Sequence, residues 1–338
     1  MKQHDTPPGD KHPEKSQDPP SPPTVLIVGT GAVGGFYGAA LARAGAQVTT
    51  VHRSDFDTVR QHGIHIDSLN GSFLFRPYRV TNRVEACDTP DFLLVAMKAL
   101  PGQPVAEIIR PAVGPNTVII MVQNGLGAEE PVQQAFPNHE IIAGLAFVCL
   151  QRTTPGHIQH LCHGKITLGR HPEGISPAVR RLESLFQAGG VPCQVTDSPA
   201  RARWTKLVWN AAFNPVSVLA GDITTHAMLA LPEGEKLIRT LMQEVIGVAR
   251  ALGHPLPDTL IDDHLAATRS VAPYHTTMAQ DHMAGRRMEL DAILGAAIKA
   301  AHSVGSTMPL LENIFILLKL LERKNGESSR NQCPNEHS

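Results

Sequence analysis

The 338-residue sequence lacks long apolar runs, a cysteine framework and an excess of charge of either sign. Its formal net charge of −1 does not argue for a surface that binds nucleic acid or an anionic membrane. The five cysteines form no CxxC pair, which argues against a disulfide framework and favours a reducing cytosol. No apolar stretch approaches the roughly 20 residues that a membrane helix needs. These absences predict a cytoplasmic protein with neither a nucleic-acid nor a membrane partner.

Both ends of the chain are polar. Residues 1–23 are rich in proline and contain no apolar segment, so they are not a signal peptide. They carry too little apolar surface to offset the entropy of ordering, and residues 324–338 are similar. We predict disordered tails over 1–23 and 324–338.

Between the two tails, the pattern of apolar residues changes once, near residue 198. Up to residue 197, short β-branched runs alternate with helical segments, which predicts a doubly wound α/β domain of the Rossmann type over 24–197. No convincing strand pattern follows, and Ser198-Pro199 is typical of a helix start. Residues 198–323 are therefore predicted to form an all-α domain. The expected strands cover 24–28, 47–51, 64–68, 73–80, 91–97, 117–122, 140–148, 157–168 and 193–196, with a hairpin turn at Asn70-Gly71.

A glycine motif joins the first expected strand to the first expected helix. In this strand–turn–helix context, the glycines allow a tight turn, close approach of a pyrophosphate and close helix–strand packing. The helix N-terminus adds free N–H groups. The residues predicted to bind a dinucleotide are Gly29, Thr30, Gly31, Ala32, Val33 and Gly34.

The second expected strand ends without the carboxylate that holds the ribose of NAD. The sequence there is Val51-His52-Arg53-Ser54. Because Arg53 can bind a 2′-phosphate through two hydrogen bonds and no carboxylate repels one, the cofactor is predicted to be NADPH or NADP.

Two polar residues follow later strands. Lys98 lies at the end of the strand over 91–97, directly after its last residue, and Asn124 follows the strand over 117–122. Ligands of open α/β sheets bind at the carboxyl ends of strands, so both residues are predicted to reach the cofactor.

One helix combines a polar stripe with an apolar body. Lys206, Asn210 and Asn214 are four residues apart and share one face. A lysine beside apolar surface has a lowered pKa, which suits proton transfer. The alternative is a solvated stripe on a surface helix. The side chains expected in the core are Trp204, Leu207, Val208 and Phe213.

The densest histidine group does not predict a metal site. On a regular strand His160 and Cys162 face one way, whereas His157 and His163 face the other. These side chains would not converge on one ion. A separate apolar stripe fits either the core or the surface of a homodimer, and consists of Leu237, Leu241, Val245 and Val248.

Taken together, several motifs resemble those of ketopantoate reductases (2-dehydropantoate 2-reductases), over about residues 24 to 323. The motifs are Gly29-Thr30-Gly31-Ala32-Val33-Gly34-Gly35, Lys98-Ala99, Gln123-Asn124-Gly125-Leu126-Gly127, Trp204-Thr205-Lys206-Leu207 with Asn210 and Asn214-Pro215, and Thr277-Met278-Ala279-Gln280-Asp281 followed by Glu289-Leu290-Asp291. The resemblance implies a second domain like the C-terminal domain of 6-phosphogluconate dehydrogenase. It also implies NADPH-dependent reduction of a small 2-oxo acid, ketopantoate, to (R)-pantoate on the pathway to pantothenate and coenzyme A.

The resemblance also implies roles for single residues. Lys206 would be the general acid, and Glu289 would act beside it in contact with the substrate hydroxyl and the cofactor. Asn210 and Asn214 would hold the substrate, and Thr277 would touch its carboxylate. Arg53 and Lys98 would lie near the 2′-phosphate of the cofactor. Asn124 would bridge the cofactor ribose and the substrate.

Some positions depart from the family pattern. Thr277 stands where serine is common, and Leu294 stands where asparagine is usual before Gly295. A paralogue that reduces a different 2-oxo acid is therefore an alternative. A dehydrogenase for a phosphorylated substrate would gather more cations than Arg203 and Lys206 around the stripe. A non-catalytic dinucleotide sensor would not need a proton donor.

Overall fold

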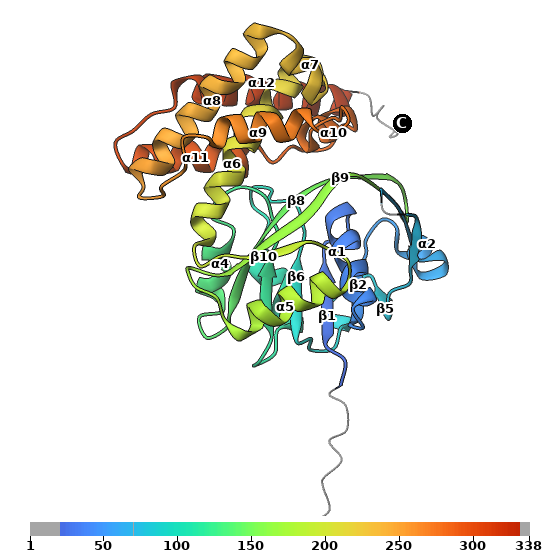
Figure 1. Ribbon diagram of the computed structural model, residues 1–338. Helices are drawn as coiled ribbons and strands as arrows, with labels where there is room; N and C mark the ends of the chain where they lie inside the picture. The colour runs from blue at the N-terminus through green and yellow to red at the C-terminus, as the bar shows by residue number, and fades with distance from the viewer. Residues whose placement is uncertain (1–20, 70, 332–338) are drawn as a thin grey trace, which may run out of the picture.

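A helical domain lies against one end of a sheet domain in the computed structural model, which describes residues 21–69 and 71–331 (Figure 1). In the described part of the chain all strands precede helix α6 (Pro199–Leu219). This helix begins beside the sheet and runs up into the helical domain (Figure 1). The predicted combination of a Rossmann-type domain and an all-α domain is confirmed. Most of the predicted N-terminal tail lies outside the described residues.

The sheet has ten strands in the described chain, in the order β4-β3-β9-β8-β7-β6-β1-β2-β5, with β10 paired to β9. From β5 to β8 neighbouring strands are parallel, whereas β9 is antiparallel to β8. The strands are β1 (Thr24–Val28), β2 (Gln47–Val51), β3 (Ile64–Ser68), β4 (Phe73–Phe75), β5 (Arg79–Thr81), β6 (Phe92–Val95), β7 (Val118–Met121), β8 (Ile141–Thr154), β9 (His157–Arg170) and β10 (Cys193–Val195).

Helices cover both faces of this sheet. The helices of the sheet domain are α1 (Ala32–Arg43), α2 (Phe56–His62), α3 (Val105–Ile109), α4 (Glu129–Ala135) and α5 (Pro177–Ala188), with short 3₁₀ turns over Val84–Ala86 and Arg110–Ala112. Val25 and Ile27 of β1 belong to the core under α1 and α5, while Leu26 and Val28 belong to the core under α3 and α4. Because both faces are buried, the central strands are apolar at successive positions.

The predicted strand over 73–80 is wrong, because the segment forms two strands at opposite edges of the sheet. β4 pairs with β3 in an antiparallel hairpin, whereas β5 pairs with β2 in parallel. Pro77 lies between them, and proline lacks the N–H that a continuous ladder requires. The hairpin itself is confirmed, while Asn70 lies outside the described residues. The pattern did not predict the short helices α2 and α4.

The helical domain is built around α6. Its elements are α7 (Thr225–Ala230), α8 (Pro232–Ala251), α9 (Leu260–Arg269), α10 (Thr277–Met283), a π-helical turn η3 (Asp291–Gly295), α11 (Ala296–Ser303) and α12 (Pro309–Asn331). The side chains of α6 that were predicted to be apolar core are at most 4% exposed. Ser198 precedes α6 as predicted, although its side chain accepts no capping hydrogen bond. No helix in the described chain is long and apolar enough to span a bilayer.

The structure also bears on the apolar stripe of α8 and on the C-terminal tail. Leu241, Val245 and Val248 are at most 1% exposed and Leu237 packs against the same cluster, so this stripe belongs to the core. The stripe therefore does not form the surface of a homodimer. The homodimer itself stays a prediction. The predicted C-terminal tail begins within α12, which continues to Asn331. Extending an existing helix adds one hydrogen bond per residue and avoids the cost of nucleation. The remaining residues of that tail lie outside the described chain.

Candidate active site

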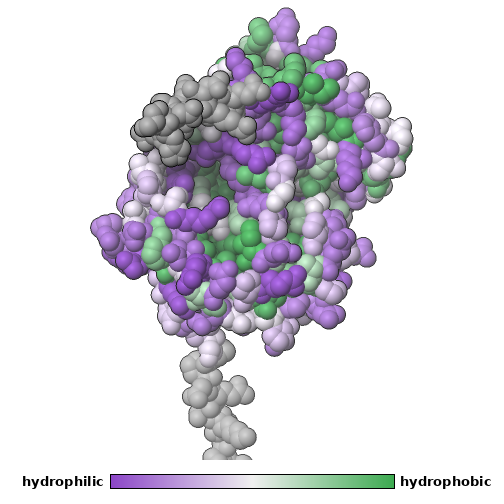
Figure 2. Space-filling view, turned by 180° about the vertical axis from the view of Figure 1, so that it is seen from behind, coloured by the Kyte–Doolittle hydropathy of each residue, from purple (hydrophilic) through white to green (hydrophobic). Residues whose placement is uncertain are grey.

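A cleft of about 740 Å³ lies at the junction of the two domains. The glycine loop and the loops after β2, β6 and β7 line one side, and α6 and α10 line the other. In the space-filling view the surface is hollowed between the domains, and polar and apolar side chains adjoin there (Figure 2). The volume and the mixed lining suit a cofactor together with a small substrate.

The glycine loop leaves open space at the N-terminus of α1. Gly29 has φ +92°, and a Cβ there would lie 2.4 Å from the backbone nitrogen of Met97. A Cβ on Gly34 would lie 2.6 Å from the Gly29 oxygen, whereas one on Gly31 would meet no atom within 4 Å. Thus Gly29 and Gly34 serve the turn and the helix packing, and Gly31 leaves an open surface over the N-terminus of α1. No side chain caps this terminus, so its free N–H groups fit a dinucleotide.

The end of β2 presents a cation to the cleft. Arg53 is exposed and lines the cleft. Asp55 also lines it, but it is 5% exposed and its carboxylate is occupied by His52 at 3.0 Å and by Arg152 at 3.1 Å. His52 and Arg152 lower the pKa of Asp55 against the opposing effect of burial, which is the largest single contribution. This carboxylate is therefore held in protein contacts, and Arg53 is left facing the cleft.

Asn124 connects Lys206 with Glu289. Lys206 Nζ donates a hydrogen bond of 2.6 Å to Asn124 Oδ1, and Asn124 Nδ2 donates one of 3.1 Å to Glu289 Oε2. Glu289 Oε1 also accepts a hydrogen bond of 2.8 Å from the Ala99 backbone N–H. The loops after β6 and β7 and the segment before η3 therefore meet at one point of the cleft.

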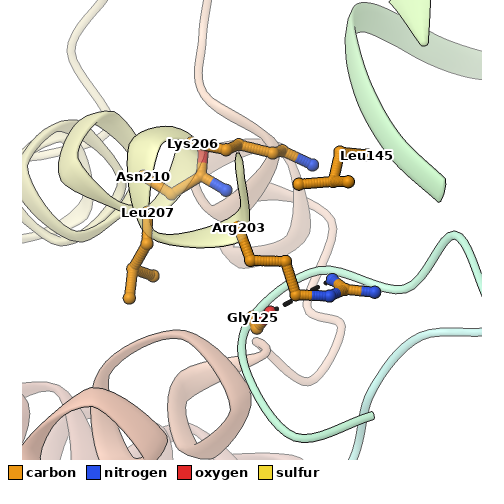
Figure 3. A pocket seen from close by; sticks show the side chains of 6 residues that line it. All are labelled: Gly125, Leu145, Arg203, Lys206, Leu207 and Asn210. Carbon is orange, nitrogen blue, oxygen red and sulfur yellow. Dashed lines mark hydrogen bonds between the residues drawn. The ribbon is translucent and has the colours of Figure 1, made fainter. Parts of the chain in front are cut away.

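Lys206 has an altered acidity. Burial and, to a smaller extent, the nearby Arg203 lower the pKa of Lys206 to about 8 against the opposing effect of Glu289. An amine with a pKa near neutrality can act as a proton donor and acceptor. Figure 3 shows Lys206 and Asn210 extending from α6 and Arg203 reaching the loop at Gly125. The small cavity of about 10 Å³ between them has room for about one water molecule.

Arg203 anchors the first turns of α6 to the loop after β7. Its guanidinium donates to the Gln123 oxygen at 3.0 Å and to the Gly125 oxygen at 3.2 Å, and it forms a buried ion pair with Glu129. Sequence reasoning treated Arg203 only as a nearby cation. The signal that could have identified its role is its place three residues before Lys206 on a helix that is otherwise apolar.

The remaining predicted residues divide between the cleft and the core. Asn210 and Thr277 line the cleft. Asn214 is 1% exposed and does not line it, and its Oδ1 has no hydrogen-bond partner among the described residues. Lys98 also lines the cleft, where its ammonium forms an ion pair with Asp281 of α10.

The alternation predicted for the histidine-rich strand is wrong. The register of β8 and β9 shifts on both sides of the Cys149–Cys162 pair, and His163 has φ +63°. His160 therefore packs against Phe36 of α1, whereas Cys162 belongs to the core cluster of the helical domain. The irregular backbone also brings the ligand atoms of Cys162 and His163 together.

Comparisons with known proteins agree with this geometry. Two family models match, "Ketopantoate reductase PanE/ApbA" over residues 25–173 and "Ketopantoate reductase PanE/ApbA C terminal" over residues 200–322. The chain is 33% identical over 304 residues to the 2-dehydropantoate 2-reductase of Nostoc sp., covering 88% of this chain and 95% of the relative.

Solved structures give the same result. The chain is 41% identical to the 2-dehydropantoate 2-reductase of Methylococcus capsulatus, with a TM-score of 0.82 and coverage of 89% of this chain and 97% of the other. It is 35% identical to the enzyme of Geobacter metallireducens, with a TM-score of 0.84 and coverage of 88% and 99%. Since the matches extend through both domains and across the cleft, the chain belongs to the ketopantoate reductase (2-dehydropantoate 2-reductase) family of dinucleotide-binding oxidoreductases.

Proposed function

We propose that this protein uses NADPH to reduce 2-dehydropantoate (ketopantoate) to (R)-pantoate, on the pathway to pantothenate and coenzyme A, with Lys206 as the general acid. The observation that carries the proposal is the hydrogen bond of 2.6 Å from Lys206 Nζ to Asn124 Oδ1 in the cleft. It holds a cation with a lowered pKa beside the space that the glycine loop opens.

Lys206 has two tasks in this reaction. When bound, NADPH supplies the hydride that adds to the keto carbon. Lys206 Nζ stabilises the negative charge that develops on the keto oxygen and donates its proton to that oxygen. The neutral amine that remains regains a proton from solvent. Asn124 orients the ammonium, and Glu289 keeps it charged by opposing the effect of burial.

The preference for NADPH rests on the end of β2. Arg53 faces the cleft, and the nearest carboxylate along the chain, Asp55, is held by His52 and Arg152. A 2′-phosphate would therefore meet the guanidinium of Arg53 at this point, while the Asp55 carboxylate is already held in protein contacts.

The experiment is steady-state NADPH oxidation by the purified full chain with a panel of 2-oxo acids that includes ketopantoate. Lys206→Ala should keep NADPH affinity and lose kcat by about 10²- to 10⁴-fold, the usual contribution of a general acid. Lys236→Ala changes an exposed lysine of α8 and serves as the matched control. Turnover by Lys206→Ala at the parental rate would remove the acid assignment. NADPH binding without turnover of any 2-oxo acid would favour a dinucleotide sensor.

A second candidate is reduction of a 2-oxo acid with a larger apolar substituent. The rings of Trp209 and Tyr274 are stacked with their centroids 6.3 Å apart, and both line the cleft. Phe147 also lines it. An apolar wall of this kind favours larger substituents, and the same panel decides between the two candidates through their kcat/KM values.

A further inference from the structure

The cleft wall formed by β8 and β9 carries a cluster that the proposed reduction does not use. Cys149 and Cys162 are directly paired across the two strands, and His163 follows. One ligand atom from each of these residues lies within 4.8 Å of the other two. Cys149 and Cys162 are 8% and 3% exposed, and His163 is half-buried.

The backbone is distorted where the cluster forms. Residues 162 and 163 of a regular strand would face opposite sides of the sheet. His163 instead adopts φ +63°, a left-handed conformation that is costly for a residue with a Cβ. Among the described residues other than glycine, only His163 and Asp222 have a positive φ. Strained backbone of this kind tends to occur where a side chain must be aimed at a site.

The donor set is chemically specific. Two thiols and one imidazole are the ligands that Zn²⁺ and similar thiophilic ions prefer, and three protein ligands leave a fourth position open. A tetrahedral Zn²⁺, with bonds of about 2.3 Å to sulfur and about 2.0 Å to nitrogen, needs its ligand atoms roughly 3.5–3.8 Å apart. Since the present separations are all below 4.8 Å, each pair of ligand atoms needs to approach by at most about 1 Å, which side-chain rotation can supply.

We propose that Cys149, Cys162 and His163 form a binding site for a thiophilic metal ion of the Zn²⁺ class, with its open position toward the cleft. Cys149 and His163 both line the cleft, so the ion would be reached from there. Binding replaces the two thiol protons, which are released to solvent, and no oxidation or reduction takes place. The site does not depend on the proposed reduction.

The test uses Co²⁺ as the probe and the full chain with Cys87, Cys193 and Cys333 changed to serine. This variant keeps only Cys149 and Cys162 of the five cysteines. Titration under reducing conditions should produce a thiolate-to-Co²⁺ charge-transfer band and the intense visible bands of tetrahedral Co²⁺, and Zn²⁺ should displace both. In this background Cys162→Ser should remove the charge-transfer band. His163→Ala should weaken Co²⁺ binding by more than the ~10-fold typical of losing an outer-shell partner.

A control separates this site from the other described group of possible ligands, His65, Asp67 and His157. That group contains no sulfur, so His65→Ala/His157→Ala should leave the charge-transfer band unchanged. Circular dichroism measures whether each variant is folded. If a cysteine variant does not fold, His163→Ala still tests the site. The proposal is overturned if the variant with only Cys149 and Cys162 gives no charge-transfer band. It is equally overturned if the band persists after Cys162→Ser.

Discussion

Lys206 Nζ lies 2.6 Å from Asn124 Oδ1, and this hydrogen bond joins a helix of the second domain to the loop that follows β7 of the first. The two residues are 82 positions apart in the chain. The amide group also donates to Glu289, so it fixes the ammonium relative to a carboxylate without bringing the two into direct contact. The site therefore depends on contacts between the two domains.

The rate of the proposed reduction should depend on pH through Lys206. The pKa of this lysine is about 8, and the donor is its protonated form. The value of kcat/KM should therefore be constant below pH 8 and fall as pH rises through this value, by about tenfold per unit. Oxidation of the product alcohol needs the neutral amine and should show the opposite slope. Because Glu289 raises the pKa of Lys206, Glu289→Gln should move the profile to lower pH, and an unmoved profile would contradict the assignment.

Asn124→Ala should reduce kcat while leaving the fold intact. A hydrogen bond to a charged group contributes about 1.5–3 kcal/mol. If the whole of this free energy stabilises the transition state, its loss lowers kcat roughly 10- to 150-fold. Steady-state kinetics at saturating substrate measure the loss. Asn313→Ala, which changes an exposed amide of α12, should have no effect on kcat. Equal rates for the two variants would show that the orientation of Lys206 does not depend on Asn124.

Arg53→Ala should reverse or abolish the cofactor preference. Loss of a charge-assisted contact to the 2′-phosphate should raise KM for NADPH about tenfold or more and leave KM for NADH nearly unchanged. The control is Arg60→Ala on α2, an arginine that does not line the cleft. Equal changes in the two KM values would indicate that Arg53 does not contact the phosphate.

Gly29 and Gly31 should respond differently to alanine. Gly29→Ala places a Cβ 2.4 Å from the Met97 nitrogen at φ +92°, so it should destabilise the fold by at least about 1–3 kcal/mol. Gly31→Ala meets no atom within 4 Å, so the melting temperature should not change. Its methyl group would occupy the open surface over α1, and NADPH binding should be lost. Thermal unfolding and calorimetric titration measure the two effects, and NADPH binding by Gly31→Ala at parental affinity would refute the proposed pyrophosphate site.

Arg203→Ala should destabilise the protein more than any surface arginine variant. It leaves Glu129, 2% exposed, without its ion-pair partner, and breaking a buried pair costs about 3–5 kcal/mol. Arg180→Ala removes an exposed pair with Glu183 and should cost less than about 1 kcal/mol. Urea unfolding gives both values. A small loss for Arg203→Ala would mean that the ion pair does not anchor α6.

Local patterns were sufficient for much of the fold. The strand, glycine loop and helix around Gly31 follow from residues that are neighbours in the chain, and so does the stripe that places Lys206 and Asn210 on one face of α6. Such features depend on backbone preferences and on periods of 2 or 3.6 residues, which can be recognised within a short stretch of sequence. The division into a sheet domain and a helical domain follows from the same periods.

Other features depended on contacts between distant segments. Pairing Glu289 with Asn124 joins residues 165 positions apart, and no local pattern indicates it. The separation of β4 from β5 depends on which edge of the sheet each strand meets. The burial of Asn214 depends on the helices around α6.

The chemical groups and the periodicity that present Lys206, Asn210 and the glycine loop can be predicted from the sequence, because they are properties of short segments. The position of Asn124 between Lys206 and Glu289, and the meeting of Cys149, Cys162 and His163, follow only from tertiary contacts. The first depends on how the two domains pack against each other. The second depends on register shifts between β8 and β9, which reverse the direction of a side chain without changing the pattern of the sequence.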